Sequence, residues 1–283
     1  MKSHTTRNTS TGLSTGTSPL LAPGSLLLAP PPRRRGGFTL VEMLVVIGII
    51  IVLLGIALPA IHSARQKGLR TRMAMDLQVI SQALEAYRQD FKDYPRVDYS
   101  NANLTPGTLG AVTLCWALLS PGPATGNGSD GADGPGFRVR GTQGQIYGPY
   151  IQPGKFKISG SNDWNSTIND ENGNPYLYFP RSAGANINVA NGYIGNYTSS
   201  PPTPRPMYNF GDNSGVTSPN GSAFTQQMME TQMGDLDNNG GINGAEVPAT
   251  TAPYILWGAG GDSTFGPPPY NTSAASDDVT NFN

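Results

Sequence analysis

The sequence predicts an α+β protein in which one long N-terminal helix, transmembrane in its first half, packs on a small antiparallel sheet with long loops. Three observations carry this prediction. An apolar run occupies residues 38–61, an apolar stripe of helical period continues to residue 91, and short runs rich in aromatic and β-branched residues follow. The 36 glycines and 25 prolines among 283 residues indicate long irregular connections.

The long helix is predicted in two parts, which together make roughly 55 residues. Residues 38–61 span about 36 Å as a helix at ~1.5 Å per residue, enough to cross a hydrocarbon core of ~30 Å. Residues 62–95 continue it as an amphipathic helix, because apolar side chains recur three or four positions apart. That stripe consists of Leu69, Met73, Leu77, Ile80, Leu84, Tyr87 and Phe91. Pro95 should end the helix, and Pro59 should kink or loosen it locally because proline has no N–H to donate.

Residues 96–283 are expected to form a globular head with loop inserts. The apolar run Leu109–Leu119 predicts a short second helix, whereas residues 120–136 and 198–222 are rich in Gly, Pro, Ser and Asn and predict loops. Four runs predict strands: Ile146–Ile151, Phe156–Ile158, Pro175–Phe179 and Tyr254–Trp257.

Composition excludes several classes of function. Five of the 18 basic residues and none of the 19 acidic ones lie in residues 1–37, so the rest of the chain carries 13 basic against 19 acidic side chains, a net charge of -6. A chain of that charge is not expected to bind nucleic acid. His62 is the one histidine after residue 37, so the head lacks the base of a Ser-His-Asp or Cys-His site, and no enzyme is expected. The lone Cys115 lies in an apolar run and is expected to be a buried thiol.

The most informative motif is R-R-R-G-G-F-T-L-V-E, residues 33–42, directly before unbroken apolar sequence. It places Glu42 inside a membrane span, where a carboxylate costs about 2.5–3.5 kcal/mol on insertion scales and is usually functional. The segment resembles the class III signal of type IV prepilins and type II secretion pseudopilins. The resemblance implies that residues 1–37 are a leader peptide, which a prepilin peptidase removes between Gly37 and Phe38 on the cytoplasmic face before Phe38 is N-methylated.

In the processed chain Glu42 is the fifth residue, where that family keeps a glutamate, and Pro59 occupies the place of a family proline. The functional interpretation is that the Glu42 carboxylate meets the methylated, cationic amine of Phe38 on a neighbouring subunit, which offsets part of the desolvation cost and fixes the register. The alternative is a carboxylate that is protonated in lipid or reaches toward the headgroups.

Four head segments resemble the major pseudopilin of type II secretion: Y-G-P-Y-I at 147–151, G-N-P-Y-L-Y at 173–178, P-Y-I-L-W-G-A-G-G-D-S-T-F-G at 253–266 and D-D-V-T-N-F at 277–282. Residues 76–95 of the helix resemble it as well. The resemblance implies a pilin-like subunit that polymerises with itself and other pseudopilins into a pseudopilus for protein secretion. It also implies an assembly ATPase, an inner-membrane platform protein, a single-pass inner-membrane anchor and a periplasmic head. The inserts 98–140 and 181–250 depart from that family. The alternatives are a surface type IV pilin for adhesion, motility or DNA uptake, and a membrane-tethered binding domain that never polymerises.

Residues 235–246 match the twelve-residue calcium loop D-x-D-x-N-G-x-I-x-x-x-E. The expected ligands are Asp235, Asp237, Asn239, the Gly241 carbonyl, Asn243 and Glu246. Gly240 should allow the sharp turn, and Ile242 should point into the core. Residues 223–233 could be the entering helix, whereas Pro248 argues against an exiting one. The alternative is a polar turn without metal.

A second calcium site is implied by the resemblance alone. In the similar pseudopilins an Asp-bearing C-terminal loop binds calcium, and this chain has Asp262, Asp277 and Asp278 there. The alternative is a solvated acidic loop. Calcium is thus the one cofactor expected, as a structural element that takes the place of a disulfide.

Overall fold

The computed structural model describes residues 37–100, 105–119, 137–140, 143–152, 154–159, 165–217, 224–266 and 276–282. The chain divides into two compact units, residues 1–52 and 53–283, and each is considered by itself. Residues 1–36 of the predicted leader 1–37 and the predicted loop 120–136 lie outside the described residues.

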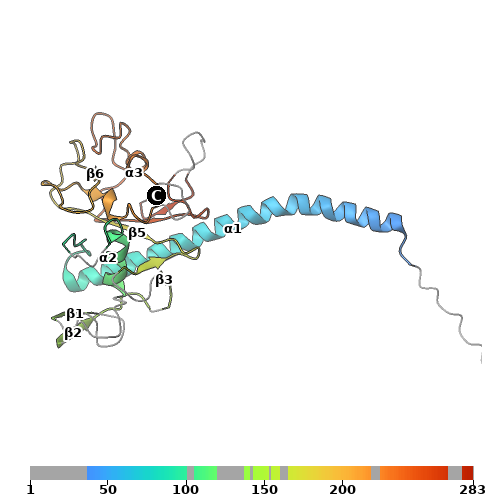
Figure 1. Ribbon diagram of the computed structural model, residues 1–283, viewed down its shortest axis with the longest axis horizontal. Coiled ribbons are helices and arrows are strands. Elements are labelled where there is room, and N and C mark those ends of the chain that lie inside the picture. Colours follow the sequence, from blue (N-terminus) through green and yellow to red (C-terminus); the bar gives the residue numbers. More distant parts are fainter. Residues whose placement is uncertain are drawn as a thin grey trace, which may run out of the picture. The chain divides into compact units, whose positions relative to one another are not determined.

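Helix α1 (Leu40–Phe91, 52 residues) begins in the first unit and ends in the second (Figure 1). Its N-terminal half is long and apolar enough to cross a membrane and buries none of its side chains. The helix continues through Pro59, so the proline does not interrupt it, and the predicted local kink stays a prediction. The predicted helix is therefore confirmed to within a few residues at each end.

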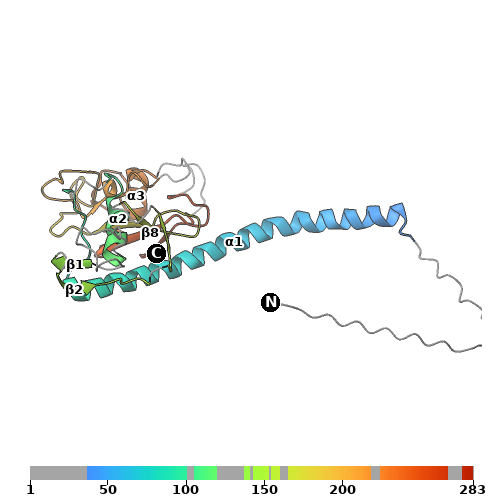
Figure 2. The ribbon, with the colours of Figure 1, turned by 60° about the horizontal axis from the view of Figure 1, so that its bottom comes forward.

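The second half of α1 packs on the head through the predicted stripe. Met73, Leu77, Ile80, Ala83 and Leu84 are buried in a first core cluster. Helix α2 (Leu109–Leu118) contributes Leu114, Cys115 and Leu118 to the same cluster and lies beside α1 (Figures 1 and 2). The predicted second helix and the predicted buried thiol are both confirmed.

The central sheet has the strand order β5-β8-β9 and is antiparallel. Strands β5 (Leu177–Pro180) and β8 (Tyr254–Gly258) pair with Leu177 opposite Trp257, and β9 (Val279–Thr280) adds a short edge. Alternate side chains point to opposite faces of a strand. Accordingly Tyr178 and Leu256 join the cluster of α1, whereas Phe179 and Trp257 join a second cluster on the other face.

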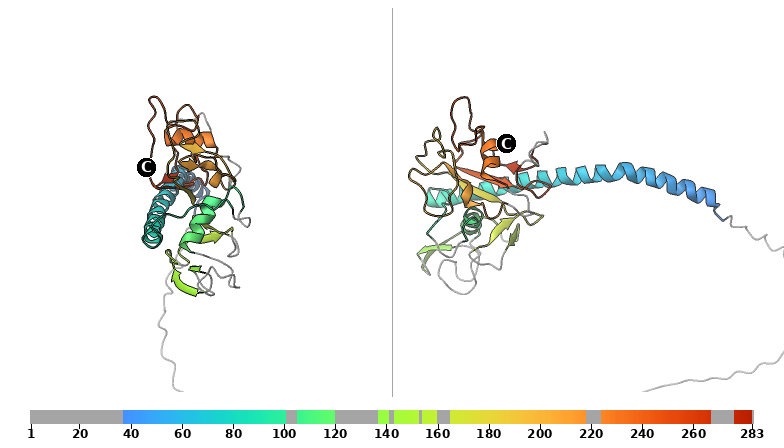
Figure 3. Two further views of the ribbon diagram at one scale, coloured as in Figure 1. Left: turned by 90° about the vertical axis from the view of Figure 1, so that its left-hand side faces the viewer. Right: turned by 45° about the horizontal axis from the view of Figure 1, so that its top comes forward.

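The second face of this sheet is covered by the insert 181–250. Its elements are β6 (Ile194–Gly195), β7 (Tyr208–Asn209), the 3-10 helix η1 (Phe210–Asp212) and α3 (Gln226–Met233). Aromatic and Met side chains from these elements are buried against Trp257 and Ile255. Figure 3 shows α3 and α1 on opposite sides of the sheet strands. Residues 198–222 are thus wrongly predicted as loop throughout, because the described part contains β7 and η1.

Two further antiparallel strand pairs lie in the described part of the head: β1 (Phe137–Arg140) with β2 (Gln143–Tyr147), and β3 (Lys157–Ser159) with β4 (Thr167–Asn169). The predicted strand at 146–151 is wrong beyond Tyr147, where Gly148 and Pro149 follow. The other three predicted strands overlap β3, β5 and β8. The pair β6–β7 is parallel, which departs from the expected antiparallel pattern, but the α+β class of one long helix on small, mostly antiparallel sheets is confirmed.

Candidate functional site

The start of α1 is built by a reciprocal pair of hydrogen bonds between Thr39 and Glu42. The Thr39 N–H and its Oγ1 hydroxyl both donate to Glu42 Oε2 at 2.8 Å, and the Glu42 N–H donates to Thr39 Oγ1 at 3.2 Å. This is a capping box, in which side chains satisfy N–H groups that a helix start leaves unpaired. The carboxylate of Glu42 is therefore held at the first turn of the apolar helix, one turn from Phe38.

Gly37 and Phe38, which precede this capping box, are not covered by other described residues. Phe38 is 76% exposed, and a side chain added at Gly37 would meet nothing within 4 Å. Residues 32–58 match the family model of the prokaryotic N-terminal methylation motif. The chain carries a type IV pilin-like prepilin signal. The match includes Gly37, Phe38 and Glu42, and the predicted resemblance is confirmed at this level.

The prepilin signal implies processing by a prepilin peptidase and polymerisation of the processed subunit. Together with the apolar half of α1 it also supports anchoring in a membrane. No curated protein and no solved structure matches the chain. The matched segment ends at residue 58 and includes no residue of the head.

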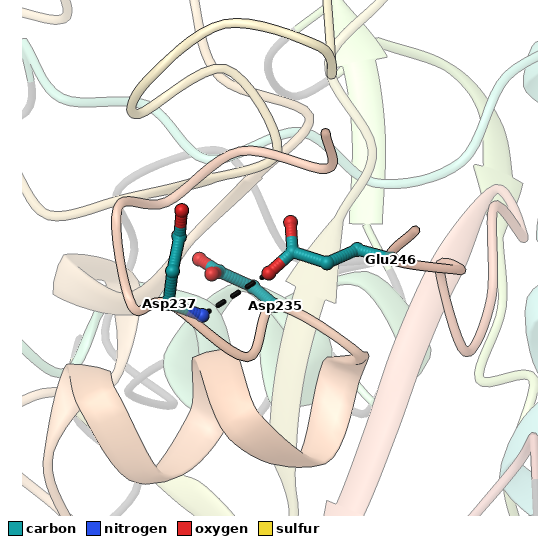
Figure 4. Close-up of side chains that lie close together, drawn as sticks. All are labelled: Asp235, Asp237 and Glu246. Atoms are coloured by element: carbon teal, nitrogen blue, oxygen red, sulfur yellow. Dashed lines mark hydrogen bonds between the residues drawn. The ribbon is translucent and has the colours of Figure 1, made fainter. Parts of the chain in front are cut away.

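The predicted calcium loop brings three carboxylates together in the head (Figure 4). One ligand oxygen from each of Asp235, Asp237 and Glu246 lies within 4.8 Å of the others. Among the residues that the structure describes, this is the one such group of three acidic, His or Cys side chains. None of the three takes part in an ion pair with a described basic residue.

Backbone N–H groups hold these carboxylates in place. Asp235 Oδ2 accepts from the Gly240 N–H at 2.6 Å, and Glu246 Oε1 accepts from the N–H groups of Leu236 and Asp237 at 2.7 and 3.1 Å. The Asn243 N–H donates to Glu246 Oε2 at 2.9 Å. The chain thus folds back so that Glu246, eleven positions after Asp235, closes the loop, as the spacing of the motif predicts.

The amide side chains of the motif also lie at the cluster. Asn239 Nδ2 donates to Asp237 Oδ2 at 2.7 Å, and Asn243 Nδ2 reaches the same oxygen at 3.5 Å. The Asn239 Oδ1 accepts from the Gly241 N–H at 2.8 Å, so Gly241 lies in the loop as predicted. Helix α3 enters the loop directly, whereas residues 247–253 form no helix, as Pro248 indicates.

The loop is anchored to the second core cluster. Ile242 is buried there, as predicted, and its N–H donates to the Ile187 carbonyl at 2.6 Å. The carbonyl of Gly240 accepts from the N–H groups of Tyr193 and Ile194 at 2.8 and 2.9 Å. Gly240 has φ +76°, and a Cβ there would lie 2.6 Å from the Ile194 carbonyl oxygen, so both the turn and the close approach require glycine.

The electrostatics of this loop fit a cation. Burial raises the pKa of Asp235, and burial together with the neighbouring carboxylates raises the pKa of Glu230 on α3. In contrast the Asn243 N–H lowers the pKa of Glu246. A set of carboxylate and amide oxygens without nitrogen or sulfur is the donor chemistry of a hard divalent cation such as Ca²⁺.

The C-terminal acids are arranged differently. Asp277 Oδ2 accepts from the N–H groups of Gly261 and Asp262 at 2.7 and 3.0 Å, and Asp278 Oδ2 accepts from Trp257 Nε1 and the Gly266 N–H, both at 2.7 Å. Asp278 Oδ1 is buried and has no hydrogen-bond partner among the described residues, and burial raises the pKa of this carboxyl to about 7. A buried oxygen without a partner fits a metal ligand, although the three acids do not form a group within 4.8 Å.

Sequence reasoning missed a buried network under the segment that follows α1. Asp212 is 1% exposed, and its Oδ1 accepts from the Tyr99 hydroxyl and from Asn209 Nδ2. Burial raises the pKa of Asp212 to about 7. No sequence signal could have found it, because Tyr99 lies 113 positions away from Asp212, and Asn209, three positions away, belongs to a segment without periodicity.

Proposed function

We propose that the processed chain is a pseudopilin, a structural subunit that polymerises into a pseudopilus for type II protein secretion. The observation that carries this proposal is the prepilin signal followed at once by a membrane-spanning helix with Glu42 in its first turn. An assembly ATPase and an inner-membrane platform protein would drive extrusion, with the helix in the inner membrane and the head in the periplasm. The work of such a subunit is mechanical, and we propose no enzymatic role.

The head motifs favour secretion over a surface pilus. Residues 173–178 hold the sheet to α1, because the Tyr176 hydroxyl donates to Asp76 Oδ2 at 2.9 Å and the Tyr178 hydroxyl donates to the Pro95 carbonyl at 2.8 Å. Residues 253–262 and 277–282 contain β8 and β9 of the same sheet. The segments that resemble a major pseudopilin are thus those that build the face on which the helix packs.

We propose that assembly depends on Oε1 of Glu42, the carboxylate oxygen to which Thr39 does not donate. The Oε2 of Glu42 is engaged by Thr39, whereas the hydrogen bonds of this carboxylate to described residues leave Oε1 available. That oxygen could accept from the cationic amine of Phe38 on a neighbouring subunit. In a medium of low dielectric such a pair offsets part of the cost of burying both charges, and it selects one register between the helices.

The test compares Glu42→Ala with Glu42→Gln in cells that contain the secretion machinery. We expect both variants to insert in the membrane and to be cleaved, but to be absent from sheared or cross-linked filaments, because neither carries the negative charge. Wild-type filament yield from Glu42→Ala would contradict the proposal. Loss of export on deletion of the gene, without loss of surface fibres, would favour secretion, and the opposite pattern would favour a surface pilus.

We also propose that calcium is a structural part of the head. Asp235, Asp237 and Glu246 would hold one ion with help from Asn239 and Asn243, and Asp278 Oδ1 with Asp262 and Asp277 would contribute to a second. A bound ion stabilises the folded head by mass action, because the unfolded chain has no preformed site. Calcium would in this way stabilise the head of a chain that has one cysteine and no disulfide.

A further inference from the structure

A cationic groove of about 460 Å³ lies where α1 ends against the head. Its walls come from the last turn of α1 and the segment after it, from residues 180–184 at the end of β5, and from Pro253 before β8. Four basic side chains and one acidic side chain line it: Arg88, Lys92, Arg96 and Arg181 against Asp93. The groove is therefore positive on a chain whose residues after the leader carry a net charge of -6.

Two of the basic groups are in exposed ion pairs that can rearrange. Arg88 pairs with Glu85 at 3.2 Å and Arg96 pairs with Asp93 at 2.6 Å, and all four side chains are about half exposed or more. Exposed pairs of this kind contribute little to stability. An incoming carboxylate could therefore replace an internal partner at little cost.

The other two basic groups have no carboxylate partner among the described residues. Lys92 Nζ donates to the Gln89 carbonyl at 2.7 Å, and Arg181 Nη1 donates to the Thr251 carbonyl at 3.1 Å. Neither enters an ion pair with any residue in the described parts of the chain. These two positive charges remain uncompensated at the groove.

Lys92 also has a strained backbone. Its φ of +63° is left-handed and lies directly after α1, where glycine is the common residue because other side chains cost free energy there. Backbone strain of this kind concentrates at sites that bind ligands. Lysine at this position supplies a charge to the groove that glycine would not.

We propose that this groove binds an acidic peptide segment of a partner protein. Carboxylates pair with guanidinium groups through two parallel hydrogen bonds, and Pro180, Ala183 and Pro253 offer apolar contacts for the aliphatic part of a peptide. A nucleic acid is disfavoured, because the surrounding head is acidic and would repel a long polyanion. The inference does not depend on polymerisation, since it concerns the head of a single subunit.

The experiment uses the processed full-length chain in detergent and two labelled eight-residue peptides, one with four Glu residues alternating with Gly and one with Gln in place of Glu. Fluorescence polarisation in 50 mM and 300 mM NaCl measures binding. We expect the Glu peptide to bind at least tenfold more tightly than the Gln peptide, and the affinity to fall with salt. The double variant Lys92→Gln/Arg181→Gln should weaken binding at least tenfold, whereas the control Lys155→Gln, an exposed charge elsewhere on the head, should not.

Three results would overturn the proposal: equal binding of the Glu and Gln peptides, unchanged binding in the double variant, or an equal loss in Lys155→Gln. A single-stranded oligonucleotide that binds the groove more tightly than the Glu peptide would assign it to phosphates instead. The unfolding temperature of the double variant, which we expect to be within about 2 °C of the unsubstituted chain, shows that any loss of binding is not a loss of fold. A negative result in this binding experiment would not contradict the proposed processing and filament formation.

Discussion

Replacing Asp237 by asparagine should change the stability of the head in opposite directions with and without calcium. Three carboxylates whose ligand oxygens lie within 4.8 Å repel one another when no cation is bound. At that distance each pair costs about 1 kcal/mol in water and about 3.5 kcal/mol at an effective dielectric of 20. Asp237→Asn removes one charge and keeps an oxygen, so without calcium the variant should be more stable than the unsubstituted chain.

With calcium the Asp237→Asn variant should instead be less stable than the unsubstituted chain, because it loses a charged ligand. A site with a Kd of about 10⁻⁴ M, typical of extracellular modules, contributes about 1.8 kcal/mol at 2 mM calcium. For a head of this size 1 kcal/mol corresponds to about 2–4 °C in Tm. Calcium should therefore raise the Tm of the unsubstituted chain by about 4–7 °C, and Asp237→Asn should lose most of that rise.

The assay is thermal unfolding of the processed chain in detergent, in 2 mM calcium and in EGTA. Asp98→Asn, the same substitution at an acid outside the loop, is the matched control and should respond to calcium like the unsubstituted chain. Magnesium at 2 mM should have a smaller effect, because it retains its water ligands. A Tm that is the same with calcium and with EGTA would refute the reasoning, as would a variant destabilised equally under both conditions.

Two further predictions concern the buried parts of the head. The pKa of Asp212 is raised to about 7 from an ordinary 3.8, so between these values the folded state retains a proton that the unfolded state loses. Protonated Asp212 therefore contributes up to about 4 kcal/mol to the free energy of unfolding below pH 4, and this contribution disappears as the pH rises through 7. Asp212→Asn should flatten this dependence in urea unfolding between pH 4.5 and 8, and an unchanged slope would contradict the assignment. Gly240→Ala should destabilise the head by about 2 kcal/mol or more with and without calcium, because the turn and the contact with Ile194 both exclude a side chain; a loss seen with calcium alone, in thermal unfolding, would show that the glycine acts through the ion.

The sequence could predict those parts of the fold in which residues of one kind recur at a regular spacing. The stripe from Leu69 to Phe91 gives six successive helical intervals, so the second half of α1 follows from periodicity, and its first half follows from the unbroken apolar run 38–61. The acidic loop 235–246 follows from fixed spacing, since Glu246 at position twelve returns to Asp235 at position one when the chain winds around a point. These signals are local in sequence.

The first part of the insert, residues 181–217, could not be predicted because its elements are too short to show a period. Strands β6 and β7 have two residues each and pair across a gap of more than ten residues, and the aromatic side chains of Tyr193 and Tyr208 find their partners only in three dimensions. The burial of Asp278 could not be predicted for the same reason, because its Oδ2 accepts from Trp257 Nε1 and the Gly266 N–H only in the folded head. The structure of these residues depends on burial in the folded head, which leaves no pattern in the local sequence.

The central claim is that a prepilin peptidase trims this chain so that Phe38 becomes its N-terminus. Mass spectrometry of the N-terminal peptide, from protein isolated from its own cells, tests that claim most directly. We predict a chain that begins at Phe38 with one methyl group on its amine. A chain that retains Gly37 and the preceding arginines would contradict the account.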